Sequence, residues 1–187
     1  MDQRDLVERA GRGDHDAFAV LVRGIVARLD AAARLILHDP ELARDAVQEA
    51  FVKAWRDLPG LRDPDRFDAW IHRITVRSCL ELLRRRRRRV IEVELTPSAD
   101  VPVGDIGAFV VDRDQVERAL RRLDPDWRAI VVVHYFLGLP LPEAAAALGI
   151  PLGTAKSRLH RSLAAMRLEL QLEPGSEAVE LPRGQIA

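Results

Sequence analysis

The sequence predicts an all-α protein of two small helical domains joined by a flexible linker, the C-terminal one a helix-turn-helix. Apolar residues recur at helical intervals in both halves, helix-start signals precede several of these runs, and a stretch rich in proline and glycine separates them. With 187 residues, 48% hydrophobic and 31% charged, the chain can bury one or two small cores without metals or disulfides.

Residues 1–91 are predicted to form one helical bundle. Asp39 followed by Pro40 supplies a side-chain acceptor and then a preset backbone angle, so a helix should begin there. Asp14 and Asp65 each precede a further amphipathic run and are expected to cap it. These starts divide the segment into several helices with apolar faces.

Residues 92–111 are predicted to be the linker, since they contain two prolines, two glycines, four acidic residues and no basic residue. A second helical block follows over residues 112–172, with a start at Asp124-Pro125. Residues 173–187, again with two prolines and two glycines, are predicted to be a loose tail.

The segment 130–136 is β-branched and aromatic, and by propensity alone it favours a strand. The helix cap just upstream and the lack of a nearby pairing strand favour a buried helix instead.

A helix-turn-helix is predicted over residues 140–170, with a turn around Gly149 and a second helix from about 153 or 154. Arginine can donate two bonds to guanine, and serine, histidine and lysine can contact bases or phosphates in a major groove. The alternative is a solvated amphipathic helix. The candidate reading face consists of Thr154, Lys156, Ser157, Arg158, His160 and Arg161.

The second candidate surface is basic. Residues 70–90 hold eight arginines against Glu81 alone, although the whole chain has zero net charge. Aromatic side chains beside a basic face can stack on unpaired bases. The alternatives are a solvated face and, for Trp70, simple core packing. The candidate residues are Phe67, Trp70, Arg73, Arg77, Arg84 and Arg88.

The third candidate surface is acidic and lies on the helix beginning at Pro40. Its core side carries apolar residues at helical spacing, and an acidic outer side cannot serve DNA, so it indicates a protein partner or a plain solvated face. The outer residues are Asp45, Gln48, Glu49, Val52 and Arg56.

Several function classes are disfavoured. Cys79 is the only cysteine and the five histidines lack metal-ligand spacing, so we expect no metal and no cofactor. No paired carboxylates or histidine cluster lie beside the arginines, so we expect no enzyme, a phosphodiester-cleaving one included. No signal peptide and no apolar run of membrane-spanning length is visible, which predicts a cytoplasmic protein without direct membrane contact.

Three segments in this order closely resemble extracytoplasmic-function sigma factors of bacterial RNA polymerase: DAVQEAFVKAW, FDAWIHRITVRSCLELLRRR and LGIPLGTAKSRLHRSLAAMR. The resemblance covers about residues 5–91 and 113–170. It implies sigma region 2 in the first domain, a connector near the polymerase active-site channel, and sigma region 4 in the second.

The resemblance also implies roles for the three surfaces. The acidic one would bind core RNA polymerase at the beta prime clamp, the basic one would open and read the minus-ten element, and the helix-turn-helix would read the minus-35 element. Further implied partners are the beta flap, promoter DNA and an anti-sigma factor.

Two departures from the family pattern affect these expectations. The usual Ala-x-Asn stands here as Thr75-Val76-Arg77, so base preferences do not transfer. Pro140 replaces a frequent capping Ser or Thr, so that helix start is expected to shift. A free-standing helix-turn-helix regulator, usually a symmetric dimer, remains the alternative function.

Overall fold

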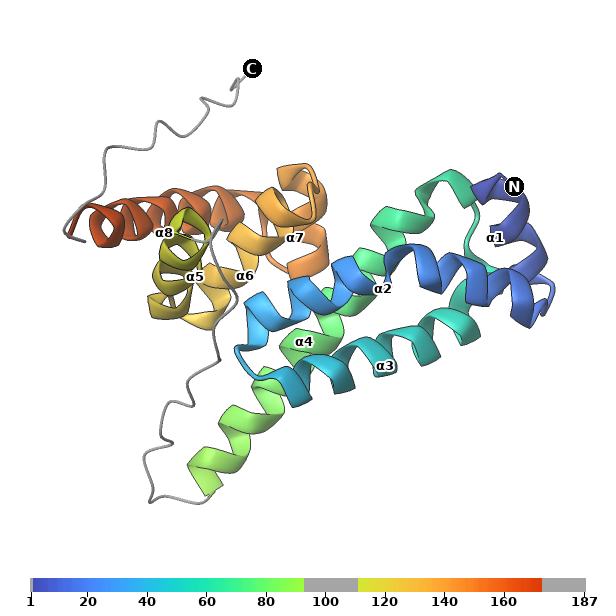
Figure 1. Ribbon diagram of the computed structural model, residues 1–187, viewed down its shortest axis with the longest axis horizontal. Coiled ribbons are helices and arrows are strands. Elements are labelled where there is room, and N and C mark those ends of the chain that lie inside the picture. Colours follow the sequence, from blue (N-terminus) through green and yellow to red (C-terminus); the bar gives the residue numbers. More distant parts are fainter. Residues whose placement is uncertain (1, 93–110, 173–187) are drawn as a thin grey trace.

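The structure is a computed structural model that describes residues 2–92 and 111–172 (Figure 1). Over these two ranges the regular structure is helical throughout, which confirms the predicted all-α class. The predicted linker, apart from Glu92 and Val111, and the predicted tail lie outside the described residues.

The first four helices form the N-terminal domain, in which α2, α3 and α4 pack against one another and α1 packs on α2 (Figure 1). Small residues on the inner face of α3, including Ala43, Ala50 and Ala54, are fully buried, which lets its neighbours approach closely. The helices are α1 (Gln3–Gly11), α2 (His15–Leu37), α3 (Pro40–Asp57) and α4 (Phe67–Glu92).

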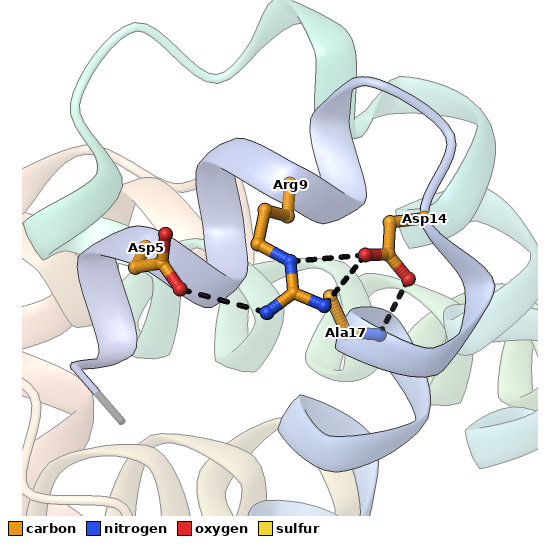
Figure 2. Close-up of polar contacts among 4 residues, drawn as sticks. All are labelled: Asp5, Arg9, Asp14 and Ala17. Carbon is orange, nitrogen blue, oxygen red and sulfur yellow. Dashed lines mark hydrogen bonds and ion pairs between the residues drawn. The ribbon is translucent and has the colours of Figure 1, made fainter.

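Asp14 caps α2 as the sequence predicts. Its carboxylate accepts a hydrogen bond of 3.0 Å from the backbone N–H of Ala17, and a second helix contributes Arg9, whose Nη2 donates to it at 2.8 Å (Figure 2). The Ala17 amide and the Arg9 guanidinium hold the pKa of Asp14 below its ordinary value. Asp39 likewise accepts from the backbone N–H groups of Glu41 and Leu42, both at 3.1 Å.

The predicted cap at Asp65 is wrong by two residues. Asp63 accepts from the backbone N–H of Asp65 at 3.1 Å and starts a 3-10 segment, Pro64–Arg66, that leads directly into α4. The Asp65 carboxylate instead pairs with Arg4 of α1. Asp-Pro at positions 63 and 64 carries the same capping signal as the two Asp-Pro pairs that sequence reasoning did use.

The last four helices form the C-terminal domain. Asp124 caps α6 by accepting from the backbone N–H of Asp126 at 3.0 Å, as expected. Pro140 occupies the N-cap position of α7 with no side-chain bond, although its carbonyl accepts from the Ala144 N–H at 2.9 Å. The helices are α5 (Val111–Arg122), α6 (Pro125–Val131), α7 (Leu141–Leu148) and α8 (Leu152–Leu172).

Residues 130–136 are helical, but not as one regular α-helix. After α6 the chain widens into a π-helical turn, Val132–Phe136, closed by a bond of 3.0 Å from the Leu137 N–H to the Val132 carbonyl. Val132 and Val133 stay buried, whereas Tyr135 is 59% exposed. The helical reading of this segment is therefore correct, and the extra residue in the turn was not foreseen.

The two domains pack against each other, with α7 on α4 and α6 on α2 (Figure 1). Their buried apolar residues belong to a single continuous cluster. The arrangement brings helices from opposite ends of the sequence into direct contact, so the described residues form one closed unit.

Candidate nucleic-acid and protein interfaces

The helix-turn-helix is formed by α7 and α8. Gly149 ends α7 in the left-handed conformation with φ of 68°, and the Ile150 N–H donates to the Ala145 carbonyl at 3.0 Å, which turns the chain sharply into α8. α8 begins at Leu152, one or two residues before the predicted start. Ser162, fully buried, donates to the Trp127 carbonyl at 3.1 Å and so ties α8 to α6.

The outer face of α8 is open. Its inner side buries Ala155, Leu159 and Met166, as the spacing predicts. Of the six candidate DNA-reading residues, Thr154 and Arg158 are half-buried and the others are exposed. The exposed four, which can reach a DNA groove without rearrangement, are Lys156, Ser157, His160 and Arg161.

The basic face of α4 is partly covered. Trp70 and Arg73 line a cleft of about 400 Å³ whose opposite wall is formed by Leu139, Glu143 and Ala146. Nη2 of Arg77 donates to the Ala146 carbonyl at 3.4 Å. The part of α4 that carries the aromatic side chain therefore faces the C-terminal domain.

Phe67 does not belong to this face. Its side chain is 1% exposed and packs in the core, with its ring centroid 6.0 Å from that of the half-buried Trp70. Direct stacking of Phe67 on a base is incompatible with this packing, so the sequence-based assignment of Phe67 to base contact is corrected to support of Trp70. Farther along α4, Arg84 and Arg88 are exposed, as expected.

The outer face of α3 is exposed. Val52 is 69% exposed, which is unusual for an apolar residue, and Asp45 and Gln48 lie beside it in the open. Arg56 is exposed and pairs with Asp57 at 2.8 Å.

Glu49 differs from its neighbours on α3 because it is half-buried. Its carboxylate pairs at 3.0 Å with Lys53, which also pairs with Glu81 of α4 at 2.9 Å. Glu49 thus helps to link α3 to α4 as well as facing outward.

Arg128 is a site that sequence reasoning missed. It is 5% exposed, and its Nε and Nη2 donate to the carbonyl of Ile36 in the other domain at 3.0 and 2.7 Å. Burial lowers the pKa of Arg128 to about 10. An arginine in front of a run of five apolar residues, 129–133, is the signal that could have drawn attention to it.

Cys79 is fully buried in the described structure, and burial raises the pKa of its thiol to about 12. Of the helices described, none combines the length and apolarity needed to span a membrane.

Comparison with known proteins gives two family matches on this chain. Sigma-70 region 2 matches residues 17–89, and sigma-70 region 4 matches residues 113–166. The RNA polymerase sigma-H factor of Pseudomonas aeruginosa is 31% identical and aligns with 90% of this chain and 93% of its own. The extracytoplasmic-function sigma factor SigM of Mycobacterium tuberculosis is 38% identical and aligns with 81% and 76%.

Two solved structures share the arrangement. CnrH, solved in complex with the cytosolic domain of CnrY, is 30% identical with a TM-score of 0.64 and covers 90% of this chain and 97% of its own. The sigma factor RpoE of Bartonella quintana, solved with the anti-sigma factor NepR, is 24% identical with a TM-score of 0.68, covers 83% and 98%, and indicates the fold.

The chain belongs to the sigma-70 family of RNA polymerase sigma factors. Within that family it is of the extracytoplasmic-function type, carrying regions 2 and 4, and it directs promoter-specific initiation of transcription. The alternative of a free-standing helix-turn-helix regulator is not favoured, because a DNA reader alone has no need of region 2.

Proposed function

We propose a division of labour among the three outward faces, in which α3 binds core RNA polymerase while α4 and α8 bind one promoter. The observation that carries it is the difference in charge: α3 presents Asp45, Gln48 and Val52 outward, whereas α4 and α8 present arginines. An acidic helix with an exposed valine suits a protein surface that is basic at its rim and apolar at its centre. The beta prime clamp is the expected docking site.

On the DNA side, Trp70, Arg73 and Arg77 of α4 would bind the minus-ten element, with Arg84 and Arg88 following the phosphates. A half-buried indole beside guanidinium groups can stack on a base turned out of the duplex while the arginines hold the backbone. On α8, Lys156, Ser157, His160 and Arg161 would enter the major groove at the minus-35 element, with Thr154 and Arg158 at its edge.

The domain roles follow the same division. Residues 1–91 would carry polymerase binding and melting, residues 92–111 the connector, and residues 112–172 upstream recognition and contact with the beta flap; residues 173–187 receive no role. Chemistry stays with the polymerase, so the chain would act in the cytoplasm without catalysis of its own. An anti-sigma factor is a further expected partner, in line with the complexes in which the two structural relatives were solved.

The test is transcription and co-purification with core polymerase. Replacing Asp45 and Gln48 together by arginine reverses the charge of the α3 face without touching a buried residue. These two positions are better suited than Glu49, whose loss would also disturb Lys53 between α3 and α4. The double variant should lose at least about tenfold in polymerase affinity, a cost typical of like-charge contacts at an interface.

Glu8→Arg is the matched control, because Glu8 is an exposed acid on α1 away from this face. It should keep full polymerase binding and start-site selection. Failure of the unmodified chain to direct core polymerase to any start site, together with specific duplex binding on its own, would favour the free-standing regulator.

A further inference from the structure

The contacts between the two domains involve the same residues that the proposed function assigns to the minus-ten element. Arg77 donates to the Ala146 carbonyl of α7, and Trp70 and Arg73 lie across a cleft from Leu139. Beside them Arg66 pairs with Glu143 of α7 at 3.2 Å. A DNA strand on this face and α7 on this face would therefore compete for one surface.

A second set of contacts lies at the end of α2. The carbonyl of Ile36 is in the last turn of that helix, where carbonyls lack partners within the helix. Arg128 of α6 supplies two donors to it, and its Nη1 also donates at 3.4 Å to the carbonyls of Arg121 and Leu123 in its own domain. One guanidinium thus joins the C-terminal end of α2 to the turn between α5 and α6.

Arg28 makes a third connection. Its Nη2 donates at 3.1 Å to the carbonyls of both Phe136 and Leu137, at the end of the π-helical turn. Arg28 is itself exposed, so water competes for these bonds. The polar bonds across the interface come from arginines whose partners water can replace, which is characteristic of domain contacts that open and close.

We propose that the free chain closes on itself: α7 covers the Trp70–Arg77 face of α4, and Arg128 latches the closed state by donating to Ile36. The inference rests on the proposed role of α4 in DNA binding. The outer face of α8 stays open in this state, so the chain offers its upstream reader before its melting surface. Minus-ten DNA binding then requires the domains to part.

Distance measurements on the full-length protein test the closure. Cysteines placed at exposed Asp16 of α2 and Arg167 of α8 can carry a donor and an acceptor dye, and the buried Cys79 should not react. The chain should give one narrow, high-transfer population. Arg128→Met and, separately, Arg28→Ala should shift molecules to a broad, low-transfer population.

Arg28→Ala removes an exposed side chain, so it opens the interface without a buried loss in either domain. Arg23→Met is the matched control, because Arg23 is an exposed arginine of the same helix that donates only to the Ala19 carbonyl of its own turn. It should leave the transfer population unchanged. Helical content by circular dichroism should be equal in all variants.

Binding of a single-stranded DNA of mixed sequence gives the second readout. If closure leaves one molecule in ten competent, full opening raises the apparent affinity about tenfold. Binding of duplex minus-35 DNA should change less than twofold.

A broad population in the unmodified chain would overturn the closure, and an unchanged population in Arg128→Met would overturn the latch. Transfer changes as expected, but with no gain in single-strand binding by any variant, would support closure and count against the proposed role of α4.

Discussion

The helices α4 and α8 both carry arginines outward and apolar residues inward, yet they differ in what lies on their basic faces. α7 lies over the Trp70 end of α4, whereas no other described element occupies the face of α8 that includes Arg161. Similar amphipathic patterns therefore lead to one covered surface and one available surface. Periodicity tells which side of a helix is polar, and only the tertiary fold tells whether that side is free.

The largest expected effect separates core from surface within α4. Phe67→Ala should lower the free energy of unfolding by about 3–5 kcal/mol, because a fully buried ring is replaced by a cavity. Trp70→Ala should cost clearly less, because that ring is half-buried at the cleft. Urea unfolding followed by circular dichroism measures both. Equal losses would mean that Trp70 is also a core residue and that α4 lacks an aromatic reader.

The next effect concerns DNA binding by α8. Arg161→Ala should weaken binding of a matched minus-35 duplex by about 1–3 kcal/mol if the guanidinium makes a paired base contact. Arg73→Ala on the covered face should leave this duplex binding unchanged. Fluorescence anisotropy with matched and scrambled duplexes at one salt concentration separates base reading from phosphate contact. An equal loss on both duplexes would reduce Arg161 to a phosphate contact.

A smaller effect contrasts the buried hydroxyls of the two helices. Ser162→Ala should cost about 1 kcal/mol of unfolding free energy, because its bond to the Trp127 carbonyl joins α8 to α6. Thr75→Val should be close to neutral, because Thr75 Oγ1 donates at 3.0 Å only to the Ile71 carbonyl of its own helix turn. Thermal unfolding of the two variants measures the difference. A reversed order would show that the Ser162 bond does not hold the helices together.

The smallest effect is a pH dependence at the domain contact. Burial, with Arg128 and Arg121 nearby, lowers the pKa of His38 to about 4 from the ordinary 6.5. His38 is therefore neutral in the closed chain, and its contribution to stability is complete above pH 6.5 and declines as the pH falls toward 4. Between pH 7 and 5 the Tm should fall by about 2 °C from this residue.

His38→Asn should flatten that slope, because asparagine tolerates the left-handed backbone, φ 51°, found at this position. Part of the slope should remain, since burial and then Arg28 also lower the pKa of His72. An unchanged slope in His38→Asn would assign the whole dependence to other groups.

Much of the secondary structure could be predicted because it depends on local chemistry. Asp14, Asp39 and Asp124 cap helices as their sequence context indicates, and Ala155, Leu159 and Met166 face the core as their spacing requires. The error at Asp65 arose among neighbouring aspartates, of which only Asp63 is followed by proline.

The domain contact could not be predicted in the same way. Arg128 bonds to a carbonyl 92 positions away, and a backbone acceptor leaves no mark in the sequence. Phe67 was misplaced for a related reason, since an aromatic at the start of an amphipathic helix is compatible with either side until its neighbours are known. Whether Asp45, Trp70 or Arg161 binds its expected partner stays a prediction.

The π-helical turn at Val132–Phe136 has a consequence for how this family can vary in length. Each residue of an α-helix advances its direction by roughly 100°, so deleting one residue here would swing everything that follows around the helix axis. The Phe136 and Leu137 carbonyls would no longer meet Arg28, and α7 would leave α4. Among descendants of this gene, substitutions at Tyr135 should therefore be common and single-codon losses between 132 and 136 should be rare.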